Sequence, residues 1–550
     1  MSISPHLALA FGILAAASDG HAPENDSIRR DHLKADLIFL AGDAFRGRLT
    51  ATPENSLATE FVASRFSRLG LRPVTNDGSF FLRYNLITAR ADSTGSLEAA
   101  RGRSTRKFFQ GADFYPHRFS ASGVAHGKFA FAGFGIVAPD QGRDDYKGLD
   151  VRGRVVLVLD HEPGETDPAS LFDGVVTSEH ADPLKKAIEA ERKGAVALLI
   201  VSDLHNHPDP ENFEALAAAY WPASPPRIER YALQSRVEQV SIPVAQVSRS
   251  VACELLHGLN ESLVALSRSA ESSGGAGAVA VDDVIVTLSS AVRRHVVPDR
   301  SVIAGLQGSD PKLKDQWVVI SSHHDHEGAD GAVIFNGADD NGSGTIGLIA
   351  IAEAYASAAG KGQLPRRSIL FASFNSEERG LLGSWAFVER PPIPLAKIVA
   401  ILNMDMVGRD EEVPEGGGPK FRGLPVQKAE TNRNTFTLLG HSRSTALAES
   451  IERSNATGGF GLRIKKDYDN NVSNLIRRSD HWPFLQYGVP GVWFHAGLHP
   501  DYHTANDRPE KIRYDKMEQI VRLVHQASWD LAQQEDRPRL GEMHVRLHGQ

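Results

Sequence analysis

Residues able to bind a metal ion or move a proton recur in the second half of the chain, most of them just after apolar segments. They are two imidazoles and five carboxylates: His323, Asp325, Asp340, Glu377, Glu378, Asp405 and His503. Residues 317–322, 368–374 and 397–403 are apolar runs of strand length. An open α/β sheet presents its functional loops at the carboxyl ends of its strands, so residues distant in sequence can meet in one crevice. The arrangement therefore predicts an active site.

Two imidazoles and three of the carboxylates suit a metal site with mixed nitrogen and oxygen ligands, which zinc accepts. These predicted ligands are His323, Asp340, Glu378, Asp405 and His503. Five ligands exceed the needs of one tetrahedral ion. If Asp340 bridges, each of two ions has three protein ligands and keeps one position open, as in two-metal hydrolases. The predicted cofactors are therefore two Zn²⁺ ions.

Three further residues are given catalytic roles. Glu377 stands beside the ligand Glu378, and two adjacent carboxylates repel unless their roles differ, so Glu377 is interpreted as the general base. Asp325, two residues past His323, is expected to hold the tautomer of that imidazole. Tyr502 is expected to stabilise an oxyanion.

Other polar residues near these positions favour structural interpretations. Asp339 reads as part of a solvated turn, and Asp480 as a cap for the helix that follows it. His324, His326 and His481 add imidazoles that either tune the site or line it, and lining is the favoured interpretation because histidine is often buried without binding anything.

Five motifs in this order closely resemble the M28 family of co-catalytic zinc peptidases. They are Ser-His-His-Asp at 322–325, Gly-Ala-Asp-Asp-Asn-Gly-Ser-Gly at 337–344, Asn-Ser-Glu-Glu at 375–378, Asn-Met-Asp-Met-Val-Gly-Arg at 403–409 and Tyr-His-Thr at 502–504. By that resemblance one zinc ion takes His323, Asp340 and Asp405, and the other takes Asp340, Glu378 and His503. The resemblance also implies an aminopeptidase acting on peptides.

The predicted fold class is α/β, with a mostly parallel central sheet flanked by helices, as in zinc exopeptidases, and a smaller inserted β-rich domain. The expected divisions are a signal peptide and N-terminus over 1–24, the first part of the peptidase domain over 25–119, the insert over 120–266 and the M28-like catalytic domain over 280–540. The insert resembles a protease-associated (PA) domain. Residues 271–278 are Ser- and Gly-rich and predict a linker, and the polar segment 409–434 is a candidate lid or pocket wall.

Composition limits the classes of partner. The 550 residues carry a formal net charge of −8 and no dense basic run, which argues against nucleic acid and anionic membranes as partners. The apolar stretch 7–17 is typical of a secretory signal and is too short to span a bilayer, so we expect a secreted or periplasmic protein without stable membrane insertion after signal removal. Cys253 is the only cysteine, so no intramolecular disulfide can form.

Alternative functions fit the same motifs less well. A carboxypeptidase or dipeptidase could use the same scaffold and metal ligands. A non-catalytic receptor of the same architecture would have lost ligands, whereas all five are present here. A glutaminyl cyclase is disfavoured by the complete two-metal set and by the insert. The sequence leaves the preferred terminal residue and the oligomeric state open.

Overall fold

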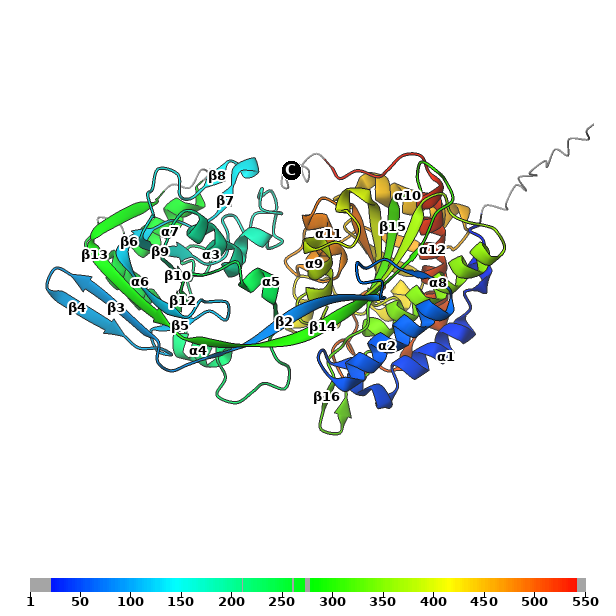
Figure 1. Ribbon diagram of the computed structural model, residues 1–550, viewed down its shortest axis with the longest axis horizontal. Helices are drawn as coiled ribbons and strands as arrows, with labels where there is room; N and C mark the ends of the chain where they lie inside the picture. Colours follow the sequence, from blue (N-terminus) through cyan, green and yellow to red (C-terminus); the bar gives the residue numbers. More distant parts are fainter. Residues whose placement is uncertain (1–20, 210, 260–261, 273–276, 542–550) are drawn as a thin grey trace, which may run out of the picture.

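The chain forms two lobes joined by a pair of long strands (Figure 1). The computed structural model describes residues 21–209, 211–259, 262–272 and 277–541. The signal peptide expected over 1–24 therefore lies almost entirely outside the described residues. The main lobe contains residues 21–91 and 292–541, and the insert contains residues 93–290, of which Ala232–Leu233 pair with the main sheet.

The main lobe is built on a 10-stranded sheet whose centre is parallel. Its central strands, in spatial order, are β18 (Ser368–Phe374), β15 (Trp317–His323), β19 (Ile398–Met404) and β22 (Gly491–His495). Antiparallel strands extend both edges of this parallel centre. On one side these are β14 (Val292–Leu306), β2 (Phe81–Ala91), β11 (Ala232–Leu233) and β1 (Arg72–Pro73). On the other side is β20 (Thr435–Leu439), and β21 (Arg463–Lys465) pairs with β20 in parallel. The predicted α/β class is confirmed, and the parallel part forms its centre.

Helices cover both faces of this sheet (Figure 1). Successive strand residues point to opposite faces, so Val318 and Ile320 pack into one core whereas Val319 packs into the other. The first core is closed by α1 (Arg30–Leu40), α2 (Pro53–Arg68), α8 (Gly344–Gly360), α10 (Thr445–Thr457) and α12 (Tyr514–Gln533). The second is closed by α9 (Leu382–Glu389) and α11 (His481–Gln486). Burial on both faces explains why these strands read as continuous apolar runs.

Local sequence signals set where the helices begin. Thr52 precedes α2, and its side chain accepts a hydrogen bond from the backbone N–H of Asn55 at 3.2 Å. Pro53 occupies the first turn, where its missing N–H costs nothing. Ala58, Val62 and Phe66 then recur every four residues and are fully buried, so α2 packs one apolar stripe against the sheet.

The insert has its own 8-stranded sheet with a parallel centre. The parallel strands are β6 (Gly123–Phe131), β9 (Arg154–Leu159), β10 (Ala197–Val201) and β12 (Val244–Val247). The other strands are β3 (Ser96–Arg101), β4 (Ser104–Phe108), β5 (Phe114–Pro116) and β13 (Val279–Ser290), and the helices are α3 (Pro183–Arg192), α4 (Phe213–Tyr220), α5 (Gln234–Val237), α6 (Arg249–Leu256) and α7 (Leu263–Glu271). The sheet thus draws on strands outside the expected span 120–266, and its parallel centre is accompanied by helices.

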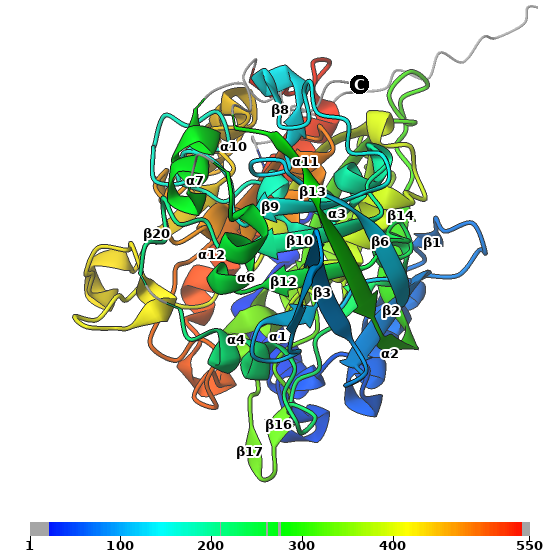
Figure 2. The ribbon, with the colours of Figure 1, turned by 90° about the vertical axis from the view of Figure 1, so that its left-hand side faces the viewer.

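Two long strands connect the lobes. β2 and β14 pair along their length, and the pairing ends where the N–H of Asp92 donates to the carbonyl of Ala291 at 2.8 Å. Figure 2 shows the molecule from the side of the insert. Asp173 of the insert pairs with Arg443 at 3.0 Å, and Glu179 pairs with Arg477 at 3.0 Å. The lobes are therefore joined by both continuous chain and side-chain contacts.

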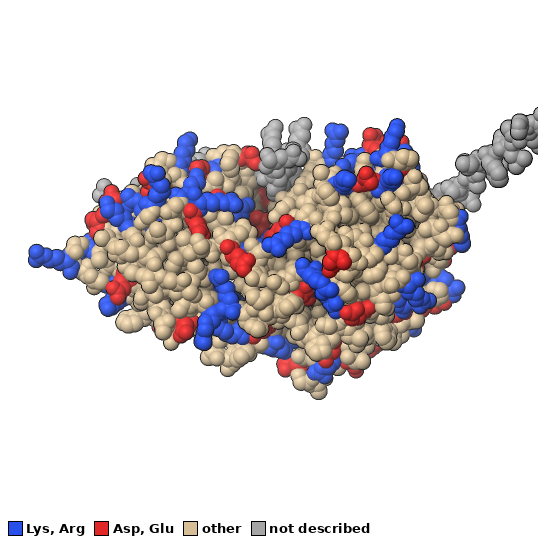
Figure 3. All heavy atoms as spheres, in the orientation of Figure 1, with Lys and Arg blue, Asp and Glu red and all other residues tan. Residues whose placement is uncertain are grey.

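The surface shown in Figure 3 carries basic and acidic side chains interspersed over both lobes. Of the helices within the described residues, none combines the length and the apolar character required to cross a bilayer. Short strand pairs complete the structure: β7 (Val137–Ala138) with β8 (Arg143–Asp144), and β16 (Ala329–Asp330) with β17 (Val333–Ile334).

Candidate metal centre

All five predicted ligands come together at one edge of the main sheet. His323 ends β15, Asp405 follows β19 and His503 lies in the loop after β22. Asp340 lies in the turn 338–343 before α8, and Glu378 follows β18. These strands are parallel neighbours, so their carboxyl ends share one edge. The geometry confirms the expectation that the residues meet in space.

Asp340 lies between two sets of side chains. Its Oδ1 is 3.4 Å from Nε2 of His323, which is also 3.4 Å from Oδ1 of Asp405. Its Oδ2 is 2.9 Å from Nε2 of His503, which is 3.1 Å from Oε2 of Glu378. Each oxygen of Asp340 therefore faces a different imidazole and a different second carboxylate, as a bridging ligand requires.

Several potential ligand atoms of the site are not satisfied by hydrogen bonds within the described part of the protein. Nε2 of His323 and Oδ1 of Asp405 are buried and have no hydrogen-bond partner within the described part of the chain. His323, Glu377 and Asp405 offer ligand atoms within 4.8 Å of one another, and so do the residues of a second group, namely His326, Asp340, Glu378 and His503. Buried polar atoms without hydrogen-bond partners are rare in proteins, so these two atoms are candidates for binding a metal ion. Imidazole and carboxylate donors suit zinc.

The two adjacent glutamates have opposite electrostatic environments. Burial, with the negative charges of Asp405 and Glu378, raises the pKa of Glu377 well above its ordinary value, against the attraction of His323. Burial also acts to raise the pKa of Glu378, but His503 and the hydrogen bond with His326 lower it overall. Glu378 keeps its negative charge, which suits a metal ligand. Glu377 has a raised affinity for protons, which suits a general base.

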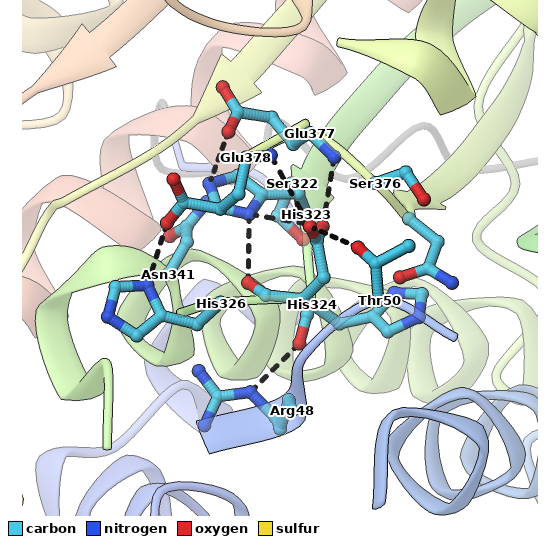
Figure 4. A network of polar contacts seen from close by, with 12 residues as sticks. Arg48, Thr50, Ser322, His323, His324, His326, Asn341, Ser376, Glu377 and Glu378 are labelled. Atoms are coloured by element: carbon cyan, nitrogen blue, oxygen red, sulfur yellow. Dashed lines mark hydrogen bonds and ion pairs between the residues drawn. The ribbon is translucent and has the colours of Figure 1, made fainter. Parts of the chain in front are cut away.

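His326 contacts a predicted ligand, whereas the sequence favoured the interpretation that it only lines the site. Its Nδ1 is 2.7 Å from Oε1 of Glu378 (Figure 4). The same atom is 3.9 Å from Oδ2 of Asp340. The neighbouring His324 has a different environment, because its ring nitrogens lie 2.9 Å from the hydroxyls of Thr59 and Ser373. The sequence pattern around a loop histidine does not tell whether its ring contacts a ligand carboxylate, as His326 does, or two hydroxyl groups, as His324 does. Only the fold distinguishes the two.

A second layer of residues fixes the backbone that carries the ligands. Both carboxylate oxygens of Asp507 accept from the N–H of Asp339, and Oδ2 also accepts from the N–H of Asp340, all at 3.0 Å. Asp339 itself accepts from the N–H of Gly408 at 2.6 Å, so it joins two loops as a structural residue. Ser479 donates to Oδ2 of Asp405 at 2.6 Å and leaves Oδ1 to face His323.

Asp480 does not cap its helix. It stands immediately before α11, as expected, but its side chain makes no capping hydrogen bond. Its Oδ1 accepts instead from the hydroxyl of Ser384 on α9 at 2.6 Å. The residue thus ties α9 to α11 beneath the site, and burial raises its pKa to about 7.

Arg48 is a buried support for the metal loops (Figure 4). Its guanidinium donates to the carbonyls of His324 at 2.8 Å, Asn336 at 2.7 Å and Gly337 at 2.9 Å, and to that of Leu40 at 3.2 Å. The preceding Gly47 has φ 69°, and a Cβ there would approach the carbonyl oxygens of Gly328 and Phe335 to 2.3 Å. The segment 46–48 is therefore structural.

Tyr502 and the segment 409–434 meet beside the site. The ring of Tyr502 lies 3.9 Å from that of His503, centroid to centroid. Burial, with the negative charges of Asp340 and Glu378, raises the pKa of its phenol well above the ordinary value, so the hydroxyl keeps its proton for donation. Lys420, within 409–434, donates to the carbonyl of Tyr502 at 3.0 Å. This contact places the segment against the loop that carries His503.

Three residues of the site loops have left-handed backbone conformations. They are Ser376 with φ 59°, Met406 with φ 58° and His503 with φ 53°. Each adjoins a predicted functional residue or is one. Such conformations cost non-glycine residues about 1–3 kcal/mol and persist where the surrounding structure imposes them. Their clustering here accords with a functional site.

Residues 301–528 match the model of peptidase family M28. This part of the chain, the M28 segment, is similar to that family. All five predicted metal ligands, together with Asp325, Glu377 and Tyr502, lie within the M28 segment.

Relatives of the chain bear the names of two kinds of peptidase. A probable glutamate carboxypeptidase of Zea mays is 25% identical over 492 residues, which cover 84% of this chain and 60% of that protein. An aminopeptidase of Bacillus subtilis is 29% identical over 230 residues, which cover 40% of this chain and 42% of that protein. The chain thus spans less than two thirds of the length of each relative. Among solved structures, an aminopeptidase from Aneurinibacillus sp. strain AM-1 is 16% identical, with a TM-score of 0.48, over 94% of this chain and 96% of that one.

Proposed function

We propose that the chain is a zinc-dependent exopeptidase that removes residues from the amino termini of peptides, using two metal ions. The observation that carries the proposal is the position of Asp340, whose oxygens lie 3.4 Å from His323 and 2.9 Å from His503. Zinc, when bound by the two sets, supplies Lewis-acid polarisation of a carbonyl group and lowers the pKa of water toward neutrality.

The residues of the chain supply the proton transfers. Glu377, whose pKa is raised by burial and by Asp405, can accept a proton and deliver it to the leaving amine. Ser479 and Asp507 keep Asp405 and Asp340 in place through their hydrogen bonds. The phenol of Tyr502 can donate to the oxygen on which negative charge develops.

The unligated carboxylate of the site favours an amino terminus over a carboxyl terminus. In the proposed arrangement Glu377 binds no metal ion and lies 3.7 Å from His323, so an ammonium group would find a carboxylate partner there. Two arginines that follow the metal loops are already paired, Arg379 with Glu327 at 2.7 Å and Arg409 with Asp501 at 3.0 Å. A substrate carboxylate would have to displace one of these ion pairs.

Carboxypeptidase action is the second candidate, and Arg478 is the observation that favours it. Its charge acts on the phenol of Tyr502, and it precedes Ser479, which contacts Asp405. Its guanidinium donates to the backbone carbonyl of Ser473, and within the described residues it has no acidic partner. Arg478 could therefore hold a terminal carboxylate.

Cleavage of one peptide in free, N-acetylated and C-amidated forms separates the two candidates. Acetylation should remove a charge-assisted contact worth about 1.5–3 kcal/mol, roughly one to two decades in kcat/KM. Amidation should leave kcat/KM nearly unchanged, and so should Arg478→Met. Retained cleavage of the acetylated peptide, with loss for the amidated peptide and for Arg478→Met, would replace the proposal with carboxypeptidase action.

A further inference from the structure

The insert holds a second group of metal-binding side chains. His161 follows β9 and His207 follows β10, and these parallel strands are direct neighbours, with Leu159 opposite Val201. Both loops therefore leave the sheet at its carboxyl edge, where open α/β sheets place their ligands. Glu165 lies in the same loop as His161, four residues further on.

We propose that His161, Glu165 and His207 bind one divalent transition-metal ion of the zinc class in the insert. Nδ1 of His161 is 3.0 Å from Oε2 of Glu165, and Nε2 of His207 is 2.5 Å from Oε1. Ligand atoms of the three residues lie within 4.8 Å of one another. The three side chains therefore form one compact group of potential ligands.

The ligand types determine which ions fit. Two imidazoles and one carboxylate match the three-ligand sites that zinc occupies with a fourth position left for water. Hard ions such as calcium and magnesium prefer sites composed of oxygen atoms. The two imidazole side chains are 42% and 41% exposed, and that of Glu165 is 18% exposed, so a further ligand can approach from solvent.

Buried residues hold the two loops in place. Asp203 is fully buried, and it accepts from the N–H of His205 at 2.9 Å and from the side-chain amide of Asn206 at 2.6 Å. Lys186 is also buried and donates to the carbonyl of Leu159 at 2.8 Å and to that of His161. The backbone at each histidine is thus positioned by groups outside the ligand set.

One residue joins the two loops. Glu271, at the end of α7, accepts from the N–H of Gly164 at 2.9 Å in the first loop and from the side-chain amide of Asn206 in the second. His161 has φ 61°, a left-handed conformation that the surrounding contacts maintain. These contacts fix the conformations of the two loops, so the three side chains lie together without a bound metal ion.

The experiment compares the metal content of the full-length protein and of single variants after equilibration with buffered micromolar zinc. His161→Gln and Glu165→Gln should each bind one zinc ion fewer than the unaltered protein. His205→Gln is the matched control, because His205 is an exposed histidine of the loop that carries His207 and lies outside the group. The zinc content of each variant is compared with that of the unaltered protein, so the result does not depend on how many ions the M28 segment binds.

Thermal unfolding of the insert gives a readout that does not depend on activity. An ion that binds only the folded form raises its stability, so zinc should raise the unfolding temperature of the insert in the unaltered protein and in His205→Gln more than in His161→Gln. Peptide cleavage should be the same in all variants and shows that each one is folded. Equal zinc content and equal zinc-dependent shifts in His161→Gln and in the unaltered protein would overturn the proposal, with the three residues then forming only ion pairs.

Discussion

Asp325 accepts a hydrogen bond at its Oδ1 from the backbone N–H of Glu377 at 3.0 Å. Its Oδ2 lies 3.3 Å from the N–H of Glu378, so one carboxylate holds both glutamates of the loop. The same side chain lies 3.7 Å from Nδ1 of His323, which is nearer, at 3.3 Å, to the backbone carbonyl of Asp325. Asp325 therefore positions the predicted base as well as facing the predicted ligand.

Asp325→Asn should lower kcat while most of the metal remains bound. The asparagine replaces one acceptor oxygen with an NH₂ group, which faces a backbone N–H and cannot accept from it. Loss of such a supporting contact typically costs about 10–100-fold in metal affinity or activity. Steady-state kinetics and metal analysis check this. Asp330→Asn, at an exposed position, is the control and should change neither quantity.

Glu377→Gln and Glu378→Gln should have different effects although the residues are adjacent. The first should cut kcat by about 10²–10⁴ and leave metal content unchanged, because it removes a proton acceptor. The second should reduce metal content, because Oε2 of Glu378 lies 3.1 Å from His503 in the second ligand set. Full activity of Glu377→Gln with normal metal content would require another residue as the base.

Asp340→Ala should disturb both metal positions, whereas His503→Ala should weaken mainly one. Asp340 contributes an oxygen to each set, and His503 belongs only to the second. Elemental analysis of dialysed protein should therefore find close to two ions in the unaltered chain, about one in His503→Ala and fewer in Asp340→Ala. A fully active protein that never holds more than one ion would contradict the bridged arrangement.

Arg48→Met should destabilise the main lobe by about 3–5 kcal/mol, because it leaves four buried carbonyl groups without their donor. Arg46→Met is the control, since Arg46 is exposed and donates to a single carbonyl among the described residues, that of Gly331 at 3.1 Å. Urea unfolding measures both changes. Equal stability of the two variants would show that Arg48 is not a support for the metal loops.

His525 should make the main lobe sensitive to acid. Burial lowers its pKa to about 3, so the folded chain keeps the ring neutral while the unfolded chain protonates it near pH 6.5. The stability it contributes is present above about pH 6.5 and is lost as pH falls toward 3, by roughly 1.4 kcal/mol for each pH unit.

His525→Phe keeps an aromatic ring against Tyr355, whose centroid lies 4.8 Å from that of His525, but removes the ionisable nitrogens. Its unfolding free energy should therefore fall less steeply than that of the unaltered chain between about pH 6 and pH 4. Urea unfolding across this range provides the comparison. The exposed His32 offers the control variant His32→Gln, which should retain the original slope.

The sequence predicts well which residues meet at the candidate metal centre, because each of them adjoins a recognisable element. His323 ends an apolar run that is β15, and Asp340 lies in a Gly-rich turn before α8. The prediction that Asp340 bridges two ions then follows because five ligands give each of two ions three protein ligands only if one carboxylate is shared. The sequence did not identify Asp507, and it did not show that His326 contacts Glu378, because both roles depend on loops whose paths no periodicity in the sequence encodes.

The extent of the insert was harder to predict for a related reason. β4 has the sequence Ser-Thr-Arg-Lys-Phe, and only its last residue is buried, so it lacks the alternation that marks a half-buried strand. β3 and β13 complete the same sheet from positions on either side of the expected span 120–266. Pairing between segments so distant in sequence is a tertiary property.

The contact between Asp92 and Ala291 also has a topological meaning. Everything between them can be regarded as one large loop whose ends are fastened by a backbone hydrogen bond of 2.8 Å. The entropy lost in closing a flexible loop rises only with the logarithm of its length, by about 0.6 kcal/mol for each doubling, so the cost of an insert grows slowly with its size. A substitute domain would need to receive and return the chain in the register of β2 and β14, and to replace β11 as the edge partner of β2. Modules on this arm are therefore exchangeable in principle, while the sheet that carries the metal ligands stays constant.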